Sequence, residues 1–531
     1  MRTSARELLE QLLDTNSFVS WDRPPVTVAA SPQYRDALRK AAVAAGVDES
    51  VLTGEGLLRG RRVAVIACEF GFLAGSIGVA AAERIVSAVE RATELGLPLV
   101  ASPTSGGTRM QEGTVAFVQM VKIAGAVAAH KSAGHPYLVY LRNPTMGGVF
   151  ASWGSLGHIT FAEPGALIGF LGPRVYQALY GKAFPEGVQT AENLYRRGVI
   201  DGVLPIPVFR RIAHRALSVF SGVALPDSAA TRSHSDPEMP SPPGTPRPTA
   251  PIPVGETTEA GKERIRSDDQ RSPAAGDSVW QSVLISRRPH RPGLRELLRH
   301  VTQRVPLSGT GQGESDRTAV LALGRFRGQP CVVFGHDRRG QQGENTMGPA
   351  ALREARRSMA LARELRLPLV LVIDTVGAAL SKEAEERGLA PEIARCIADL
   401  VTLDTPTVSV LLGQGTGGGA LALLPADRVL AATHAWLGPL PPEGASAIVF
   451  RDIDHAPELA AAQRISAADL LADGVVDRIV PEFPDAADEP VDFARRMVSA
   501  IARELASLRA QPESELLAAR RARYRRLGLT S

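Results

Sequence analysis

The sequence is poor in aromatic residues and in cysteine. Phe, Trp and Tyr make up 5% of the 531 residues, and the three cysteines are Cys68, Cys331 and Cys396. They lie far apart and form no CxxC or Cys/His cluster, so we expect no metal site. An odd number without framework spacing is typical of a reducing compartment, which predicts a cytoplasmic protein.

Long apolar runs and a strong net charge are also lacking. The first residues contain no apolar signal core, and no run approaches the roughly 20 apolar residues that span a bilayer, so we expect no membrane role. The formal net charge is only +4, which does not demand a nucleic-acid partner. With 44% hydrophobic and 22% charged residues, the chain reads as an ordinary globular protein of two to four domains.

Several catalytic motifs are missing as well. The sequence has no GxSxG, no HExxH, no Walker A motif and no GxGxxG that opens a first βαβ unit. The segment GQGTGG at 413–418 superficially resembles a dinucleotide loop. It lies deep in the second half and lacks an acidic residue after the following strand, so we do not expect a nucleotide role.

What the sequence does contain is an internal repeat. ELGLPLV at 94–100 returns as ELRLPLV at 364–370, and the Gly147-Gly148 pair returns 270 residues later as Gly417-Gly418. GVIDGVLP at 198–205 returns as GVVDRIVP at 474–481. Two copies of one fold with a glycine pair in the same place predict two similar pockets, and therefore a function with two ligands.

The composition divides the chain into three parts. We expect folded units at 1–225 and 277–531, joined by a disordered linker at 226–276 that is rich in Pro, Ser and Thr. In both units apolar runs alternate with helical patterns, which indicates α/β units with largely parallel strands. The expected strands are 62–68, 97–101, 137–141, 331–334, 369–373 and 407–412. The expected helices are 80–95, one from near Arg109, 350–365, 393–400 and 513–526.

Glycines follow the expected strands just before helices. These are Gly106-Gly107, Gly147-Gly148 and Gly417-Gly418-Gly419. Unpaired N–H groups at such turns can form an oxyanion hole, although glycine pairs also serve simply to permit tight turns. Glu112 is a candidate general acid or base, but the favoured interpretation is that it stabilises the start of the helix or pairs with Arg109. For the lone His158 and His336 a structural role is the default.

At this point a resemblance becomes specific. The first unit resembles the β subunit of the carboxyltransferase of bacterial acetyl-CoA carboxylase, and the second unit is similar to the α subunit. The first set of matching segments is 5–14, 69–78, SGGTRMQE at 105–112, PTMGGV at 144–149, 162–170 and 172–175. The second set is RPHRP at 288–292, 335–336, 373–375, AEERG at 384–388, GGGALA at 417–422 and PEGA at 442–445.

The resemblance implies two tandem crotonase-like (ClpP/crotonase) domains of α/β class. It implies transfer of CO2 from carboxybiotin, borne by a separate biotin carboxyl carrier protein, to the α-carbon of acetyl-CoA or a close acyl-CoA, with a biotin carboxylase as a further partner. Gly106 and Gly107 would hold the thioester oxygen, Gly418 and Gly419 the ureido oxygen of biotin, and Gly147, Gly148 and Arg109 would complete the acyl-CoA pocket. No covalently bound cofactor is implied. In this family the two pockets usually meet between two chains, so a homodimer or higher oligomer is expected.

The chain also departs from the family pattern. The zinc ribbon that precedes β subunits is not seen before the matching region, so no zinc is expected. The family's proline and tyrosine after Asp374-Thr375 are replaced by Val376, Ala379 and Leu380. The basic segment after His336 is only partly kept, as Asp337-Arg338-Arg339-Gly340. Three alternatives stay open: a decarboxylase of malonyl or methylmalonyl thioesters, a biotin-independent hydratase or isomerase, and a non-catalytic assembly subunit.

Overall fold

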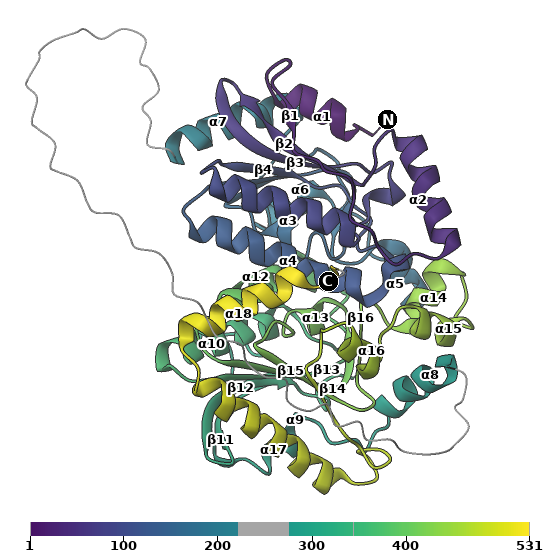
Figure 1. Ribbon diagram of the computed structural model, residues 1–531, viewed down its shortest axis with the longest axis vertical. Helices are drawn as coiled ribbons and strands as arrows, with labels where there is room; N and C mark the ends of the chain where they lie inside the picture. Colours follow the sequence, from purple (N-terminus) through teal and green to yellow (C-terminus); the bar gives the residue numbers. More distant parts are fainter. Residues whose placement is uncertain (1, 221–274, 343–344, 530–531) are drawn as a thin grey trace, which may run out of the picture.

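The computed structural model describes residues 2–220, 275–342 and 345–529 (Figure 1). Two halves, each built on its own sheet, pack against one another, with the N-terminal half above the C-terminal half in Figure 1. The predicted linker at 226–276 lies outside the described residues, except for its last two positions. Those positions belong to helix α8 (Ala275–Ser286).

The two sheets have the same strand order. Seven strands of the first sheet follow the order β1-β2-β3-β4-β5-β7-β9, and the second follows β10-β11-β12-β13-β14-β15-β17, with β16 paired to β14. In each sheet the first three strands are antiparallel and the rest are parallel. The sheet order therefore shows in space the repeat that the sequence predicts.

The strand bounds are close to the predicted ones. In the first half they are β1 (Val19–Ser20), β2 (Val51–Leu58), β3 (Arg61–Cys68), β4 (Leu99–Ser102), β5 (Tyr137–Leu141), β6 (Thr145–Met146), β7 (Ile159–Ala162), β8 (Ile168–Gly169) and β9 (Gly202–Val203). In the second half they are β10 (Thr302–Leu307), β11 (Ala319–Phe326), β12 (Gln329–His336), β13 (Leu369–Thr375), β14 (Thr407–Thr416), β15 (Arg428–Ala432), β16 (Trp436–Gly438) and β17 (Arg478–Val480).

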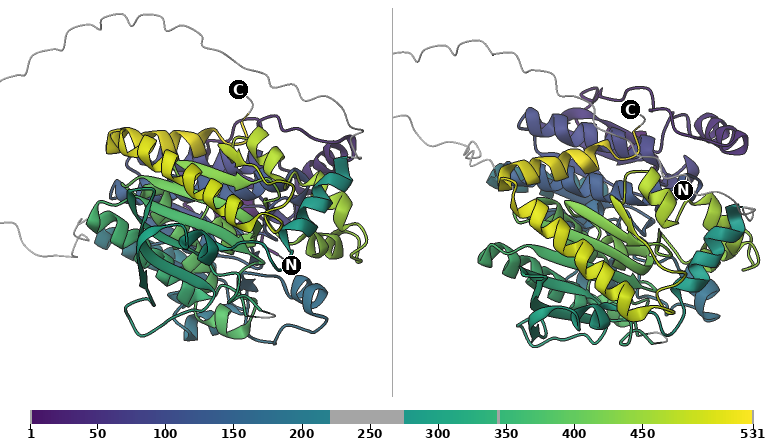
Figure 2. Two further views of the ribbon diagram at one scale, coloured as in Figure 1. Left: turned by 90° about the horizontal axis from the view of Figure 1, so that it is seen from below. Right: turned by 60° about the horizontal axis from the view of Figure 1, so that its bottom comes forward.

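Helices cover both faces of each sheet (Figure 2). The first half contains α1 (Ala5–Leu12), α2 (Pro32–Ala45), α3 (Val79–Glu94), α4 (Gly113–Ser132), α5 (Pro173–Tyr180), α6 (Ala191–Arg196) and α7 (Ile206–Phe220), with short 3-10 turns at Leu73–Gly75, Met110–Glu112 and Trp153–Ser155. After α8 come α9 (Leu294–Leu298), α10 (Pro349–Leu365), α11 (Lys382–Glu386), α12 (Leu389–Thr402), α13 (Gly417–Leu421), α14 (Pro442–Val449), α15 (Ala456–Ala462), α16 (Ala467–Ala472), α17 (Pro490–Arg509) and α18 (Glu513–Arg526).

Strand β3 shows why the sheet is buried on both faces. Val63 and Val65 pack in the hydrophobic cluster that includes α1 and α7, whereas Ala64 and Ile66 pack in the cluster that includes α3 and α4. Successive side chains of a strand point to opposite faces, so an unbroken apolar run is what a strand covered on both sides requires.

Helix α4 lies where the two halves meet. The segment Met110–Ser132 has the length and composition of a membrane span, which corrects the expectation from the sequence that no such stretch exists. Most of it is buried, and α4 packs against α3 of its own half and against α12 and α18 of the other. Its apolar character is thus accounted for by burial between the halves.

Candidate active site

Two hydroxyl-braced turns follow equivalent strands of the two sheets. After β4, the N–H of Gly107 donates to Ser105 Oγ at 3.0 Å, and after β13 the N–H of Gly377 donates to Thr375 Oγ1 at 3.0 Å. Both glycines have positive φ, 124° and 136°. Other residues rarely adopt this conformation, so glycine is required at both positions.

A second pair of matched turns lies beside the first. Gly147 follows β6 with φ 64°, and Gly417 opens α13 with φ 60°. The next residues, Gly148 and Gly418, are also glycine for a packing reason. A Cβ on Gly418 would lie 2.8 Å from the Phe170 ring, which belongs to the other half.

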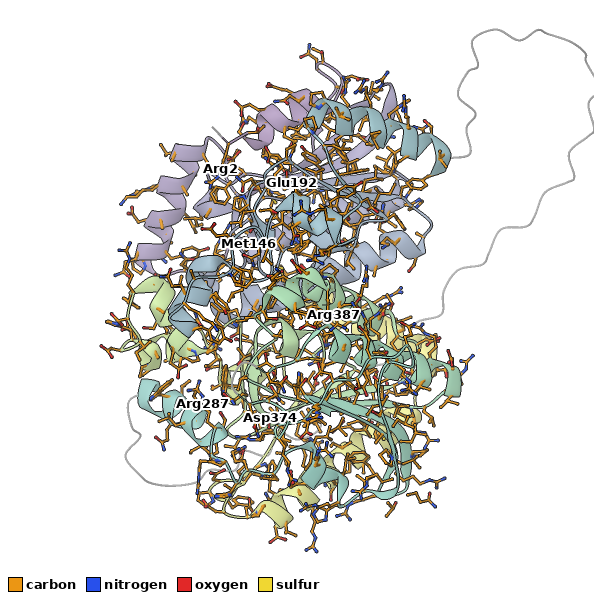
Figure 3. The ribbon with its side chains drawn as sticks, turned by 180° about the vertical axis from the view of Figure 1, so that it is seen from behind. Arg2, Met146, Glu192, Arg287, Asp374 and Arg387 are labelled. Carbon is orange, nitrogen blue, oxygen red and sulfur yellow. The ribbon has the colours of Figure 1, made fainter. Side chains whose placement is uncertain are left out.

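All four turns line one cavity of about 390 Å³ between the halves. Gly106, Gly107, Gly147 and Gly148 come from the first half, and Gly377, Gly417 and Gly418 come from the second. None of its described lining residues carries a charge. Figure 3 labels Met146 of its wall, whose other apolar members include Met110, Phe117, Phe170, Leu171, Tyr180, Val376, Leu380, Ile393, Leu421 and Ile448.

The hydrogen bonds show which of the predicted N–H donors are already engaged within the protein. The N–H of Gly106 donates to Ala74 O at 2.9 Å, that of Gly107 to Ser105 Oγ, and that of Gly147 to Gly169 O at 3.1 Å. These three residues line the cavity, but their N–H groups already have acceptors. Gly419 is not among the described lining residues.

The free N–H groups belong to the residues that follow the positive-φ glycines. In the described part of the chain, the N–H groups of Thr108, Gly148 and Ala378 have no acceptor in the protein. The N–H of Gly418, the second residue of α13, has no partner within its helix. All four residues line the cavity, and 270 positions separate Thr108 from Ala378 and Gly148 from Gly418.

Arg109 was predicted to help bind the substrate, but it is not among the described residues that line the cavity. Its side chain is 1% exposed and forms a two-pronged ion pair with Glu49, at 2.5 Å and 2.9 Å. It also donates to the carbonyl oxygen of Ser76 at 2.7 Å. Arg109 therefore belongs to a buried hydrogen-bond network that stabilises the turn at Gly107 from the side facing away from the cavity.

Glu112 also has a structural place. Its Oε2 accepts the N–H of Val79, the first residue of α3, at 2.6 Å, and its Oε1 accepts the Tyr34 hydroxyl at 2.5 Å. Arg109 lies 3.6 Å away. Glu112 thus pairs with Arg109 and stabilises the start of a helix, which are the two structural roles predicted for it. The helix is α3, however, and not α4, which begins directly after Glu112.

Two lone histidines are likewise structural. His336 is buried, its Nε2 lies 3.1 Å from Met347 Sδ, and its Nδ1 accepts the N–H of Asp374 at 3.3 Å. Burial lowers the pKa of His336 to about 4, so the ring is neutral at pH 7. His158 Nδ1 accepts the N–H of Tyr137 at 3.0 Å.

A second, polar cavity adjoins the first at Val376. It has a volume of about 550 Å³, and two residues of its wall, Arg338 and Asp374, form an ion pair at 3.1 Å. Figure 3 labels Arg287 and Asp374 of its wall, which also includes His290, Arg291, Arg339, Gln341 and Gln414. The positions that depart from the family pattern, Val376 and Leu380, thus line the first cavity, and Arg338 and Arg339 line the second.

One important residue escaped the sequence reasoning. Glu385 of α11 accepts the N–H of Phe170 at 2.8 Å and the Gln189 side-chain amide at 2.7 Å, both from the other half. Burial raises the pKa of this carboxyl to about 7. The AEERG segment marked a family resemblance, but nothing local in it indicates partners 196 and 215 positions away.

Comparisons with known proteins identify the class. Residues 2–248 match a carboxyl transferase domain model, and residues 263–528 match an acetyl co-enzyme A carboxylase carboxyltransferase-like model. The chain is 60% identical over 529 residues to the probable biotin-dependent acyl-coenzyme A carboxylase beta3 subunit of Mycobacterium tuberculosis, covering 99% of both chains. It is 36% identical over 547 residues to the acetyl-coenzyme A carboxylase carboxyl transferase subunits beta/alpha of Salinispora arenicola, covering 99% of this chain and 91% of that protein.

The fold and the matched glycine turns define a carboxyltransferase with two tandem crotonase-like domains, which confirms the predicted fold class. A transcarboxylase 12S structure aligns with 20% identity and a TM-score of 0.36 over 96% of this chain and 91% of that one. The chain belongs to the biotin-dependent acyl-CoA carboxylase carboxyltransferase family, with the β-like and α-like units fused.

Proposed function

We propose that this chain transfers a carboxyl group from carboxybiotin, carried by a separate protein, to the α-carbon of acetyl-CoA or a close acyl-CoA, with malonyl-CoA as the simplest product. The observation that carries the proposal is the set of four matched N–H donors on one cavity. Two belong to each half, as a reaction between two carbonyl-bearing ligands requires.

Each donor pair has a chemical role. Thr108 and Gly148 bind the thioester oxygen of the acyl-CoA and stabilise the negative charge that develops there when the α-proton leaves. Ala378 and Gly418 bind the ureido oxygen of biotin. The α-carbon loses a C–H bond and gains a C–C bond, while the carboxyl donor loses its N–C bond and takes the proton.

The walls of the cavity fit the ring system of biotin. A bicyclic ring with one carbonyl group matches a cavity that is apolar apart from threonine and tyrosine hydroxyls and backbone N–H groups. No described side chain in the wall could act as a carboxylate base, and this favours transfer over a hydratase or isomerase, which would need one. The candidate base for a hydratase or isomerase was Glu112, but its carboxylate accepts hydrogen bonds from the N–H of Val79 and the hydroxyl of Tyr34.

The proposal extends to the setting of the reaction. We expect the chain to work in the cytoplasm as a homodimer or higher oligomer, with a biotin carboxyl carrier protein and a biotin carboxylase. We expect it to supply malonyl-CoA or a homologue for lipid synthesis. The domain limits proposed for these roles remain 1–225 for the acyl-CoA half and 277–531 for the biotin half.

The reverse reaction tests the function. Purified protein is incubated with malonyl-CoA, with and without biocytin, and acyl-CoA products are followed by chromatography. Loss of malonyl-CoA that depends on biocytin supports the transferase. Loss without biocytin would indicate a decarboxylase. No turnover of malonyl- or methylmalonyl-CoA would favour an assembly subunit and refute the proposal.

A further inference from the structure

We infer that two threonine side chains of the C-terminal half, Thr346 and Thr416, bind the ureido nitrogens of biotin and make this half of the cavity selective for a cyclic urea. The inference rests on the proposed function and names the residues that decide which ligand the second half takes. The residues that carry it all belong to the C-terminal half. It therefore holds whether the other wall of the cavity comes from the same chain or from a second copy.

Both hydroxyl groups are buried in the wall of the cavity. Thr346 is 7% exposed and Thr416 is 3% exposed, and both residues line the cavity. Within the described part of the chain, neither Oγ1 atom has a hydrogen-bond partner in the protein. No other described lining residue has a buried side-chain nitrogen or oxygen in this state. Buried polar groups are almost always paired, so two such groups in one wall indicate a ligand that supplies the partners.

The two threonines lie on the two sides of the segment that carries the free N–H of Ala378. On one side, Met347 follows Thr346 and pairs with Ala378 in a parallel bridge. On the other side, β14 pairs with β13 in parallel, and Thr416 is the last residue of β14. A Cβ on Gly377 would lie 3.7 Å from Thr416 Cγ2. The two threonines therefore flank the segment that presents the N–H donor.

This arrangement is complementary to a cyclic urea. The carbonyl oxygen of a urea accepts hydrogen bonds, and the ring N–H groups on its two sides donate them. A threonine hydroxyl has two acceptor lone pairs as well as one hydrogen to donate. When the N–H groups of Ala378 and Gly418 hold the carbonyl oxygen of biotin, the two threonine hydroxyls accept from the ring N–H groups beside it. In carboxybiotin one ring nitrogen carries the carboxyl group instead, and the hydroxyl on that side donates to a carboxyl oxygen.

The internal repeat provides a comparison within the same protein. The equivalent residues, 270 positions earlier, are Ser76 and Met146, of which Figure 3 labels Met146. Ser76 is not among the described lining residues, and its Oγ accepts from Arg109 Nε at 3.3 Å. Met146 lines the cavity with an apolar side chain. The first half thus presents its N–H donors without these two hydroxyls, which suits a thioester, because a thioester has no N–H group beside its carbonyl.

The substitutions Thr346→Val and Thr416→Val test the inference, because valine keeps the shape of threonine and removes the hydroxyl. Biocytin-dependent loss of malonyl-CoA is followed for both variants over a range of concentrations of each ligand. We expect the KM for biocytin to rise about 10-fold in each variant, while the KM for malonyl-CoA stays unchanged. Thr416→Ser keeps a hydroxyl and should therefore return the KM for biocytin to near the wild-type value.

Thermal unfolding separates ligand binding from a structural role. Valine removes a buried group that no described protein atom pairs with, so the melting temperature of each variant without ligand should equal or exceed that of the wild type. A lowered melting temperature would indicate a structural role and would overturn the inference. Thr405→Val is the matched control, because the Thr405 hydroxyl is also buried without a partner in the described chain, but Thr405 is not among the described lining residues. This variant should keep both KM values.

Direct binding of biocytin, measured by isothermal titration calorimetry, distinguishes failure of this inference from failure of the proposed function. If the wild type turns over malonyl-CoA with biocytin and both valine variants keep its KM for biocytin, the inference is refuted and the function stands. If the wild type binds biocytin without turnover, the proposed function fails, and about 10-fold weaker binding by the valine variants would still support the inference. A wild type that neither binds biocytin nor responds to it would overturn both.

Discussion

The substitution Glu385→Gln tests how the two halves are held at the cavity wall. The Glu385 carboxyl is buried, and hydrogen bonds from Gln189, Phe170 and Leu171 only partly offset the burial that raises its pKa from 4.5 to about 7. No cation contributes to this shift. Below the folded pKa the group is neutral, and its carbonyl oxygen can still accept both donors.

The sign of the effect follows from linkage. The folded pKa is raised above the unfolded value, so the favourable contribution of the neutral form is complete below about pH 4.5 and is lost as the pH rises through about 7. At 1.36 kcal/mol for each pKa unit, the difference between 4.5 and about 7 amounts to about 3 kcal/mol. Glutamine keeps the carbonyl acceptor and carries no charge. The variant should therefore not lose stability between about pH 4.5 and about pH 7, as the wild type does.

The measurement is urea unfolding of the wild type and of Glu385→Gln at about pH 5 and about pH 8. We expect the variant to gain stability relative to the wild type at the higher pH by up to about 3 kcal/mol. Glu386→Gln is the matched control, because it removes the neighbouring contact between the halves, the pair with Arg197, and should show no comparable gain. Parallel pH dependence of Glu385→Gln and the wild type would refute the reasoning.

Three further substitutions test the site. Gly107→Val should lower kcat on the order of 10²–10³-fold, because its side chain would stand in open space beside the donors, and it should also lower the melting temperature because φ is 124°; Gly165→Val, at another positive-φ turn, should lose stability but keep activity. Gly418→Val should abolish transfer and also lower the melting temperature, since a Cβ there lies 2.8 Å from side chains of both halves. Arg109→Ala should cost about 3–5 kcal/mol in urea unfolding by leaving Glu49 unpaired, and an unchanged stability would contradict the buried network.

Much of the fold could be predicted because its signals are local or periodic. Strand β5 occupies the predicted residues 137–141, and α18 occupies the predicted residues 513–526, with Pro512 as its N-cap residue. The predicted start of a helix near Arg109 is a short 3-10 turn that leads into α4. The repeat offset predicts which strands are equivalent, and the two sheet orders confirm it.

The site was predicted less completely, because free N–H groups depend on distant acceptors. The N–H of Gly106 is not free, because it donates to the carbonyl oxygen of Ala74. The N–H of Gly147 is likewise not free, because it donates to the carbonyl oxygen of Gly169. The glycine pattern marks these turns correctly, but no sequence rule places an acceptor 20 or 30 residues away. The buried pair of Arg109 could not be predicted for the same reason, since its partner Glu49 lies 60 positions upstream.

The repeat also explains how one cavity can offer equivalent turns to two different ligands in the proposed function. The N–H of Arg109 donates to Ile77 O, and 270 positions later the N–H of Ala379 donates to Met347 O, so the two backbones are equivalent. The side chains differ: the first turn is backed by a buried, fully paired guanidinium, and the second by a methyl group. Equivalent backbones keep the geometry of the N–H donors in both halves. The different side chains behind the two turns allow each half to bind a different ligand. In the proposed function, the chemistry depends on the main chain of the site and the selectivity depends on the divergent side chains.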